Sequence, residues 1–256
     1  MTVDIGALLS GQIFAFILVF ARVGTVFMLM PGIGEPFVLA RARLLLAVAT
    51  TLLLVPVLAP NLPKMPEQVG EIARLLFIEI AVGLFFGTIL RLLLSALETA
   101  GLLISIQIGL SNATMFNPAF ATQGTLPGAL LSTVAVLLLF MTGMEEMLIG
   151  GMVGTYDAFK PGVALIFEDF AALMAQLMSK VFTLSAQLAM PFFMVGLLTY
   201  VPLGVMNRLM PQLQVLSVAM PLQIWAGLMI FALTITTMMI FWLEQFDQIL
   251  RTLLMR

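Results

Sequence analysis

The sequence predicts an all-α integral membrane protein, built as a bundle of apolar helices and helical hairpins. Of its 256 residues, 62% are hydrophobic and only 9% are charged, whereas charged residues make up about 25% of an ordinary soluble domain. The mean hydropathy of +1.16 agrees with this composition. No polar linker, low-complexity tract or internal repeat divides the chain. We therefore expect one membrane domain over residues 1–256.

Five apolar runs are long enough, or nearly so, to cross hydrocarbon about 30 Å thick. As helices they would satisfy their own backbone hydrogen bonds, which a membrane interior requires. In chain order the runs are Ala7 to Met30, Leu44 to Ala59, Pro127 to Met144, Val181 to Tyr200 and Val215 to Leu243. Clusters of proline and glycine predict the connecting loops, and they lie at 31–36, 60–66, 118–127 and 161–162.

Two further segments do not fit a simple span. As one continuous helix, Ile72 to Ile104 would run roughly 50 Å, so it must tilt, break or project beyond the bilayer. Between Val163 and Val181, apolar residues recur at helical spacing while Glu168, Lys180 and their polar neighbours gather elsewhere. That pattern is typical of an amphipathic helix at a membrane interface.

The composition argues against several classes of function. The formal net charge of -2 is too small to recruit nucleic acid. Histidine and cysteine are both absent, which removes imidazole catalysis, thiolate chemistry and the usual ligands of zinc and haem. The sequence contains no GxSxG, Walker or HExxH motif. We expect no enzyme activity, no cofactor and no metal site.

Four charged residues lie inside apolar stretches: Arg22, Glu79, Arg91 and Glu98. An unpaired charge there costs about 2.5–3.5 kcal/mol on insertion scales, so each is expected to be buried against a partner or water. Arg91 and Glu98 are too far apart along a helix for a direct pair and would face other helices or subunits. Structural pairing is favoured over a proton or ion pathway, because no histidine relay accompanies the charges.

Small residues offer flat surfaces at two places. Gly83 and Gly87, and likewise Gly150 and Gly154, have the spacing at which helices approach each other closely in membranes. The spacing is common by chance among apolar segments, so it indicates a possible contact and does not identify a partner.

The segment from Ile106 to Thr125 is uncharged and contains two glycines, two asparagines, a proline and two phenylalanines. It is too broken for a helix and too apolar for an ordinary loop. One interpretation is a re-entrant or plugging loop, because irregular backbone survives at membrane depth only when it is packed in protein or lines a cavity. The other is a surface loop whose phenylalanines pack on neighbouring helices.

Three blocks of residues, in this order, resemble one known family. The first block is Phe20-Ala21-Arg22, Pro31-Gly32, Gly34, Pro36, Arg41 and Arg43. The second is Gln107, Gly109 and Asn117-Pro118, and the third is Gly204, Asn207-Arg208, Pro211-Gln212, Val215 and Pro221. Over nearly the whole chain, these blocks are similar to the FliR family of flagellar biosynthesis proteins and their virulence type III secretion counterparts.

The resemblance implies a helical, multi-subunit export gate that passes unfolded flagellar proteins. FliR-like chains assemble with FliP-like and FliQ-like subunits and work beside FlhA and FlhB. The gate lies in the bacterial cytoplasmic membrane at the flagellar basal body, and the complex projects to the outer side. By the same resemblance, residues 1 to about 200 are FliP-like and about 180–256 form a FliQ-like hairpin. The flagellar branch is favoured on overall similarity.

The resemblance also places a plug inside the closed channel, which maps here onto the loop at 106–125. It favours the plugging interpretation of that loop over the surface loop. The residues assigned to the plug are Gln107, Gly109, Met115, Phe116, Asn117, Pro118 and Phe120. Uncharged, flexible apolar side chains suit a seal that has to accept many different chains.

Two rival functions are weaker. A secondary transporter for a small solute would use Arg22, Glu79, Arg91 and Glu98 as its coupling site, and it would be active as a single purified protein. A membrane enzyme acting on lipid or peptide would need a nucleophile or paired acids, which we do not find. A gate component would instead co-purify with other membrane subunits.

Overall fold

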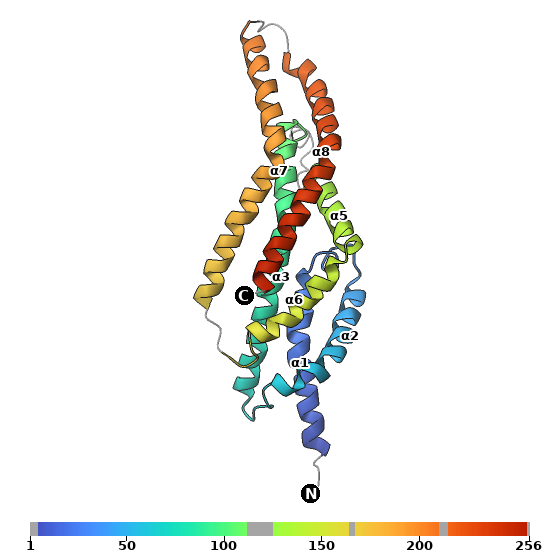
Figure 1. Cartoon of the computed structure of the whole chain (residues 1–256), viewed down its shortest axis with the longest axis vertical. Helices are drawn as coiled ribbons and strands as arrows, with labels where there is room; N and C mark the ends of the chain where they lie inside the picture. The colour runs from blue at the N-terminus through green and yellow to red at the C-terminus, as the bar shows by residue number, and fades with distance from the viewer. Residues whose placement is uncertain (1–4, 112–124, 164–166, 210–214, 255–256) are drawn as a thin grey trace. The chain divides into compact units, whose positions relative to one another are not determined.

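A computed structural model describes residues 5–111, 125–163, 167–209 and 215–254 (Figure 1). Every regular element in these ranges is helical. The α-helices are α1 (Ile5–Leu29), α2 (Ala40–Leu58), α3 (Val69–Gln107), α5 (Leu126–Met141), α6 (Met144–Ala158), α7 (Phe167–Leu209) and α8 (Val215–Leu254), and a 3₁₀ turn, Ala59–Asn61, follows α2. The predicted all-α fold is confirmed.

Five stretches of helix are long and apolar enough to cross a membrane: Gly11–Leu29, Ala40–Asn61, Val69–Gln107, Phe170–Leu209 and Ala219–Thr252. The bent pair α5 and α6 adds a sixth if it is counted as one span. The pair is broken at Gly143, whose φ of 73° few residues other than glycine adopt. The chain is therefore an integral membrane protein with several spans.

The long third segment is one helix. α3 has 39 residues, which corresponds to about 58 Å. Of the three predicted ways to accommodate this length, a break is ruled out over Val69–Gln107, because the helix is continuous there. The helix must tilt or project beyond the hydrocarbon.

The predicted boundary at Val181 is wrong. The interfacial helix and the span after it form the single 43-residue helix α7. Its buried side chains keep one spacing across the expected boundary, because Leu177, Val181, Leu184 and Leu188 all lie on one face. The sequence between them contains no glycine or proline to stop the helix.

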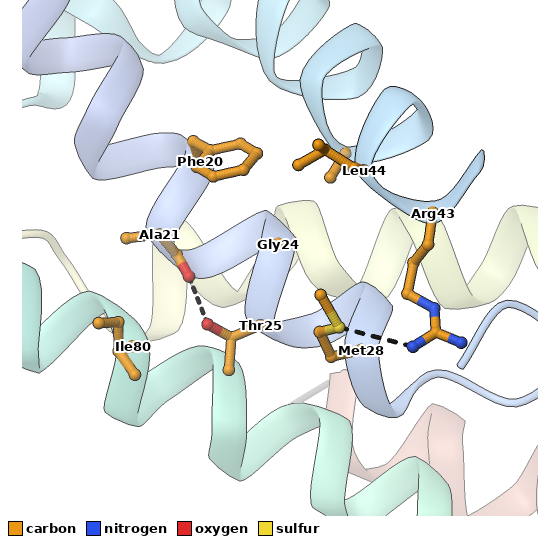
Figure 2. Close-up of a pocket in the computed structure, with 9 residues that line it drawn as sticks. Phe20, Ala21, Gly24, Thr25, Met28, Arg43, Leu44 and Ile80 are labelled. Carbon is orange, nitrogen blue, oxygen red and sulfur yellow. Dashed lines mark hydrogen bonds between the residues drawn. The ribbon is translucent and has the colours of Figure 1, made fainter. Parts of the chain in front are cut away.

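The chain divides into two compact units. The first contains Met1–Leu92, Phe140–Gln176 and Leu250–Arg256. In it α1 and α2 pack beside each other (Figure 1). A half-open groove of about 290 Å³ remains along their junction (Figure 2).

Glycine brings α3 close to α1 in this first unit. A Cβ on Gly83 would lie 2.6 Å from the carbonyl oxygen of Arg22, and one on Gly87 would lie 2.9 Å from the side chain of Leu29. These two glycines therefore form the flat surface that their spacing predicts. Gly150 and Gly154 do not, since a Cβ on either would have no neighbour within 4 Å.

The second unit contains Leu93–Leu139 and Leu177–Ile249. Its core includes Trp242, a fully buried side chain whose indole Nε1 donates to the carbonyl oxygen of Leu93 at 3.0 Å. Close packing of α3 on α5 depends on Gly101, because a Cβ there would overlap the backbone of Gly128. This packing positions the C-terminal end of α3, where the predicted plug loop begins.

Candidate functional site

The predicted plug loop begins at a turn that glycine makes. α3 ends at Gln107, and Gly109 has a φ of 83°. In this left-handed region a side chain is strained, so glycine is the usual residue where a helix stops. The amide of Gly109 donates to the carbonyl oxygen of Ile106 at 3.2 Å, and that of Ser111 donates to Ser105 at 3.2 Å. We call residues 105–111 the plug root.

Two long helices hold the plug root within the second unit. From α8, Gln223 Nε2 donates to the carbonyl oxygen of Gln107 at 2.8 Å. From α7, the hydroxyl of Tyr200 donates to the carbonyl oxygen of Ile106 at 3.5 Å. The bond from Gln223 satisfies a carbonyl group that the end of a helix leaves without an intrahelical partner, and Tyr200 adds a longer contact to a carbonyl that the Gly109 amide already binds.

Glycines let both helices approach the plug root closely. A Cβ on Gly196 of α7 would overlap the side chain of Gln107, and one on Gly227 of α8 would overlap the side chain of Ile108. Sequence reasoning identified Gln107 and Gly109 but missed Gly196, Gln223 and Gly227. The sequence signal that could have identified these residues is a single side-chain amide, that of Gln223, in an apolar run that also contains a glycine.

Five residues assigned to the plug lie outside the described residues: Met115, Phe116, Asn117, Pro118 and Phe120. Their predicted role stays a prediction. The structure describes the plug root, which precedes these five residues in the chain. Both α7 and α8 bind the plug root.

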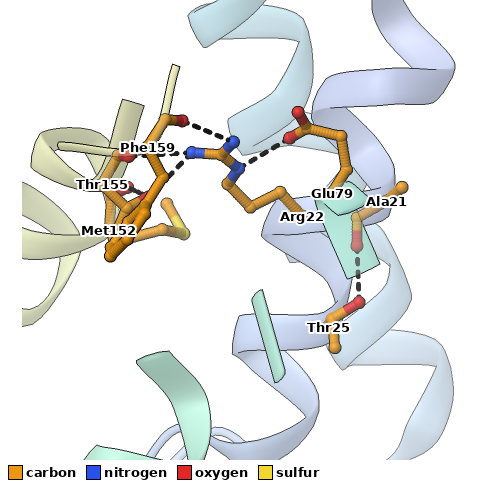
Figure 3. A network of polar contacts seen from close by, with 7 residues as sticks. All are labelled: Ala21, Arg22, Thr25, Glu79, Met152, Thr155 and Phe159. Atoms are coloured by element: carbon orange, nitrogen blue, oxygen red, sulfur yellow. Dashed lines mark hydrogen bonds and ion pairs between the residues drawn. The ribbon is translucent and has the colours of Figure 1, made fainter. Parts of the chain in front are cut away.

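The first unit contains a buried polar network around Arg22 (Figure 3). The side chain of Arg22 is 0% exposed, and its Nε lies 2.6 Å from Oε2 of Glu79, which is 1% exposed. Nη1 donates to the carbonyl oxygen of Thr155 at 3.0 Å and to its hydroxyl at 3.3 Å. Nη2 donates to the carbonyl oxygen of Phe159 at 3.0 Å.

Each nitrogen of this guanidinium therefore has an acceptor, and its plane lies over the ring of Tyr156 with the central carbon 4.0 Å from the ring centre. Arginine can join three helices in this way because its donors form a rigid planar fork. The carbonyl groups it binds belong to the end of α6 and the residue after it. Arg22 thus ties α1 and α3 to the end of α6.

The four charges predicted to lie in apolar surroundings do not form one site. Arg22 and Glu79 pair with each other. Arg91 pairs with Glu35, which sequence reasoning missed, at 2.6 Å from Nη1 to Oε1. Glu98 is exposed on this chain, so its burial against another helix or subunit stays a prediction.

The loop after α1 explains the first block of the resemblance. Gly32 has a φ of 83°, and a Cβ on Gly34 would lie 2.7 Å from the carbonyl oxygen of Met28. Arg43 donates from Nε to Ile33 and from Nη2 to Glu35, both to carbonyl oxygens, at 3.1 and 3.0 Å. The glycines make the turn and the arginine holds it closed.

The third block of the resemblance lies where α7 ends and α8 begins. Gly204, Asn207 and Arg208 are in the last turns of α7, and all three are exposed. Pro221 is an exposed residue inside α8. Pro211 and Gln212 lie outside the part of the chain that the structure describes. A Cβ on Gly204 would have no neighbour within 4 Å, so no close packing explains this glycine.

The fold and these two sites define a helical membrane protein with several spans, whose intramembrane arginine and glutamate side chains bind its helices together. Residues 13–249 match the family model of bacterial export proteins, family 1. The chain belongs to this family.

The relatives of the chain are named after the flagellum and after protein translocation. It is 34% identical over 239 residues to the flagellar biosynthetic protein FliR of Caulobacter vibrioides, which covers 93% of this chain and 95% of the relative. It is 29% identical to the FliR of Bacillus subtilis, over 82% of each chain. It is also 26% identical to the Yop proteins translocation protein T of Yersinia pestis, over 86% of this chain and 85% of that one.

Proposed function

We propose that this chain is a core component of the flagellar type III protein export gate, and that it helps to form and close the channel through which unfolded flagellar subunits cross the cytoplasmic membrane. The observation that carries the proposal is the similarity to a flagellar biosynthetic protein along almost the full length of both chains. The flagellar branch is proposed over the virulence branch because identity is 34% to that relative and 26% to the translocation protein.

The gate is a complex of several subunits. The proposed partners are FliP-like and FliQ-like chains, with FlhA and FlhB beside them, and the cargo is unfolded flagellar protein. Residues 1 to about 200 correspond to a FliP-like part and about 180–256 to a FliQ-like hairpin. The proposed location is the inner membrane at the flagellar basal body, with the complex projecting to the outer side. The length of α3, which exceeds the thickness of hydrocarbon, supports this projection.

Within the gate, the loop that follows the plug root is the proposed stopper. A stopper has to stay in the lumen while the helices around the lumen move. The residues at which the stopper loop begins therefore have to be fixed. The plug root meets this requirement, because Gln223 and Tyr200 bind its carbonyl groups and Gly196 and Gly227 pack against it. Phe116 and Phe120 then provide bulk without charge.

Deletion of Met115 to Phe120 tests the stopper. We expect cells that assemble this variant to become permeable to small ions and solutes, because the lumen loses its apolar seal. Changing Met115, Phe116 and Phe120 together to leucine should preserve the seal, whereas changing them to serine should not. Uptake of a membrane-impermeant dye reports the permeability. Unchanged permeability in the deletion strain, with normal amounts of assembled gate, removes the stopper assignment.

A further inference from the structure

The groove between α1 and α2 in the first unit is not used by the proposed function. It is lined by residues from α1 and α2 together with Ile80 of α3. Along α1, Phe20, Gly24 and Met28 share one face at intervals of one turn, so a residue without a side chain lies between two large ones (Figure 2). This arrangement cuts a notch into α1, and Leu44 and Ala47 of α2 form the opposite wall.

Among the described residues that line the groove, one keeps a polar group for a ligand. Thr25 contributes a hydroxyl, but it donates to the carbonyl oxygen of Ala21 at 2.5 Å. The other polar residue is Arg43, where Met28 and the start of α2 meet (Figure 2). An apolar groove without free hydrogen-bonding groups along its length suits a hydrocarbon chain and not a polar solute.

Within the part of the chain that the structure describes, no carboxylate pairs with Arg43. Among the described residues, neither Arg43 nor its exposed neighbour Arg41 forms an ion pair, and the carboxylate of Glu35 is already paired with Arg91. Arg43 uses three donors, on the carbonyl oxygens of Ile33 and Glu35 and on the sulfur of Met28. A guanidinium has five N–H donors, so two remain for an anion.

The surroundings of the groove are aliphatic. On α2 the side chains of Leu45 and Leu53 are 68% and 75% exposed, and both α1 and α2 are long and apolar enough to cross a membrane. Basic residues at the end of a span, next to an apolar pocket between helices, are the pattern that recognises anionic lipid headgroups.

We propose that this groove binds an anionic glycerophospholipid, with one acyl chain in the notch at Gly24 and the phosphate at Arg41 and Arg43. The volume of about 290 Å³ accommodates part of a single acyl chain. The lipid lies along the junction of α1 and α2, and its phosphate neutralises the arginines at the start of α2.

The test uses the full-length chain in phosphatidylcholine vesicles that contain a trace of photoactivatable phosphatidylglycerol, with the reactive group near the end of the acyl chain. After illumination, mass spectrometry should find the label on the segments 20–28 and 44–47. A matched trace of photoactivatable phosphatidylcholine should label these segments less. Equal labelling by both lipids overturns the proposed headgroup site.

Gly24→Leu fills the notch and should abolish labelling of both segments. A Cβ at this position makes only ordinary contacts, the nearest at 3.8 Å on the ring of Phe20, and thermal unfolding of the variant checks that its fold is kept. Gly11→Leu is the matched control on the same helix, because a Cβ at Gly11 has no neighbour within 4 Å; it should label like the unchanged chain. Labelling that survives Gly24→Leu overturns the proposed acyl-chain site.

Arg41→Gln tests the headgroup without disturbing the loop, because Arg41 is exposed. It should lower labelling by phosphatidylglycerol about fivefold, which corresponds to about 1 kcal/mol per basic residue at an anionic surface, and leave labelling by phosphatidylcholine unchanged. If the segments are labelled in the isolated chain but protected in the complex purified with its partner subunits, a protein helix occupies the groove and the lipid proposal is wrong.

Discussion

The pair of Arg22 and Glu79 shows how single residues bind this fold together. Both side chains are buried, and an unpaired buried charge is far less stable than a paired one. The same guanidinium binds the carbonyl groups of Thr155 and Phe159. The ring of Phe159 in turn lies edge-on to that of Phe85, with centres 6.2 Å apart. One arginine therefore fixes both the end of α6 and an aromatic contact to α3.

Removing one member of this pair should be worse than removing both. We expect Arg22→Met to lower the free energy of unfolding by about 3–5 kcal/mol, because Glu79 would stay buried without its partner. The double variant Arg22→Met with Glu79→Leu should recover a large part of that loss. Thermal unfolding of the purified chain in detergent measures both. Equal losses in the single and double variants would contradict the pairing argument.

Two glycines should respond in opposite directions to the same substitution. Gly101→Ala should destabilise the second unit by about 1–3 kcal/mol, because the new methyl group overlaps the backbone of Gly128. Gly150→Ala should be neutral or stabilising by up to about 1 kcal/mol, since nothing lies within 4 Å of the new atom. The same unfolding measurement compares them. A stable Gly101→Ala protein would show that α3 and α5 are not in close contact.

Residue pairing was only partly predictable from the sequence. The cost of burying charge predicted that Arg22 and Glu79 need partners, and the structure pairs them with each other. Arg91 could not be matched to Glu35, because Glu35 lies in a loop outside the apolar runs and 56 residues away. Such a contact depends on the path of the backbone, which local composition does not determine.

At the scale of helices, hydrophobic periodicity predicts which helices exist better than it predicts where each helix begins and ends. The apolar runs predicted α1 and α2, and the Pro–Gly clusters predicted the loop after α1, whereas a break in α3 was left open by the sequence and is absent over Val69–Gln107. The sequence pattern wrongly divides α7 at Val181. The residues before Val181 include polar ones and those after it are apolar, but the helix does not end there. Pro191 and Pro202 also lie inside α7, so proline in this protein does not always mark a boundary.

The plug root gives a prediction about one contact between elements. Gln223→Leu removes the bond to the carbonyl oxygen of Gln107, which is worth about 0.5–1.5 kcal/mol. We expect amides of residues 105–111 to exchange their hydrogens about fivefold faster, as that free energy implies. Gln187→Leu, at an exposed position on α7, is the control and should not change the exchange. Unaltered exchange in Gln223→Leu would mean that α8 does not hold the root.

At the scale of the whole molecule, the exposed apolar surface is the dominant feature. Large aliphatic side chains remain exposed along α2, α7 and α8, for example Leu53, Leu198 and Leu233 at 75%, 74% and 81%. Lipid can cover such surfaces, and so can related subunits. The composition predicted a membrane protein but could not distinguish these two environments, because both are apolar. Similarity to export proteins favours neighbouring subunits for at least part of this surface.

The central claim is that the chain works as one member of a gate made of several subunits. Affinity purification of the tagged full-length chain from cells, in mild detergent, followed by identification of the bound proteins, tests it most directly. We expect FliP-like and FliQ-like subunits to co-purify in constant proportion, and a strain without the chain to lose motility while its solute uptake is unchanged. A chain that purifies alone and carries a single small solute into vesicles without partners would contradict the account.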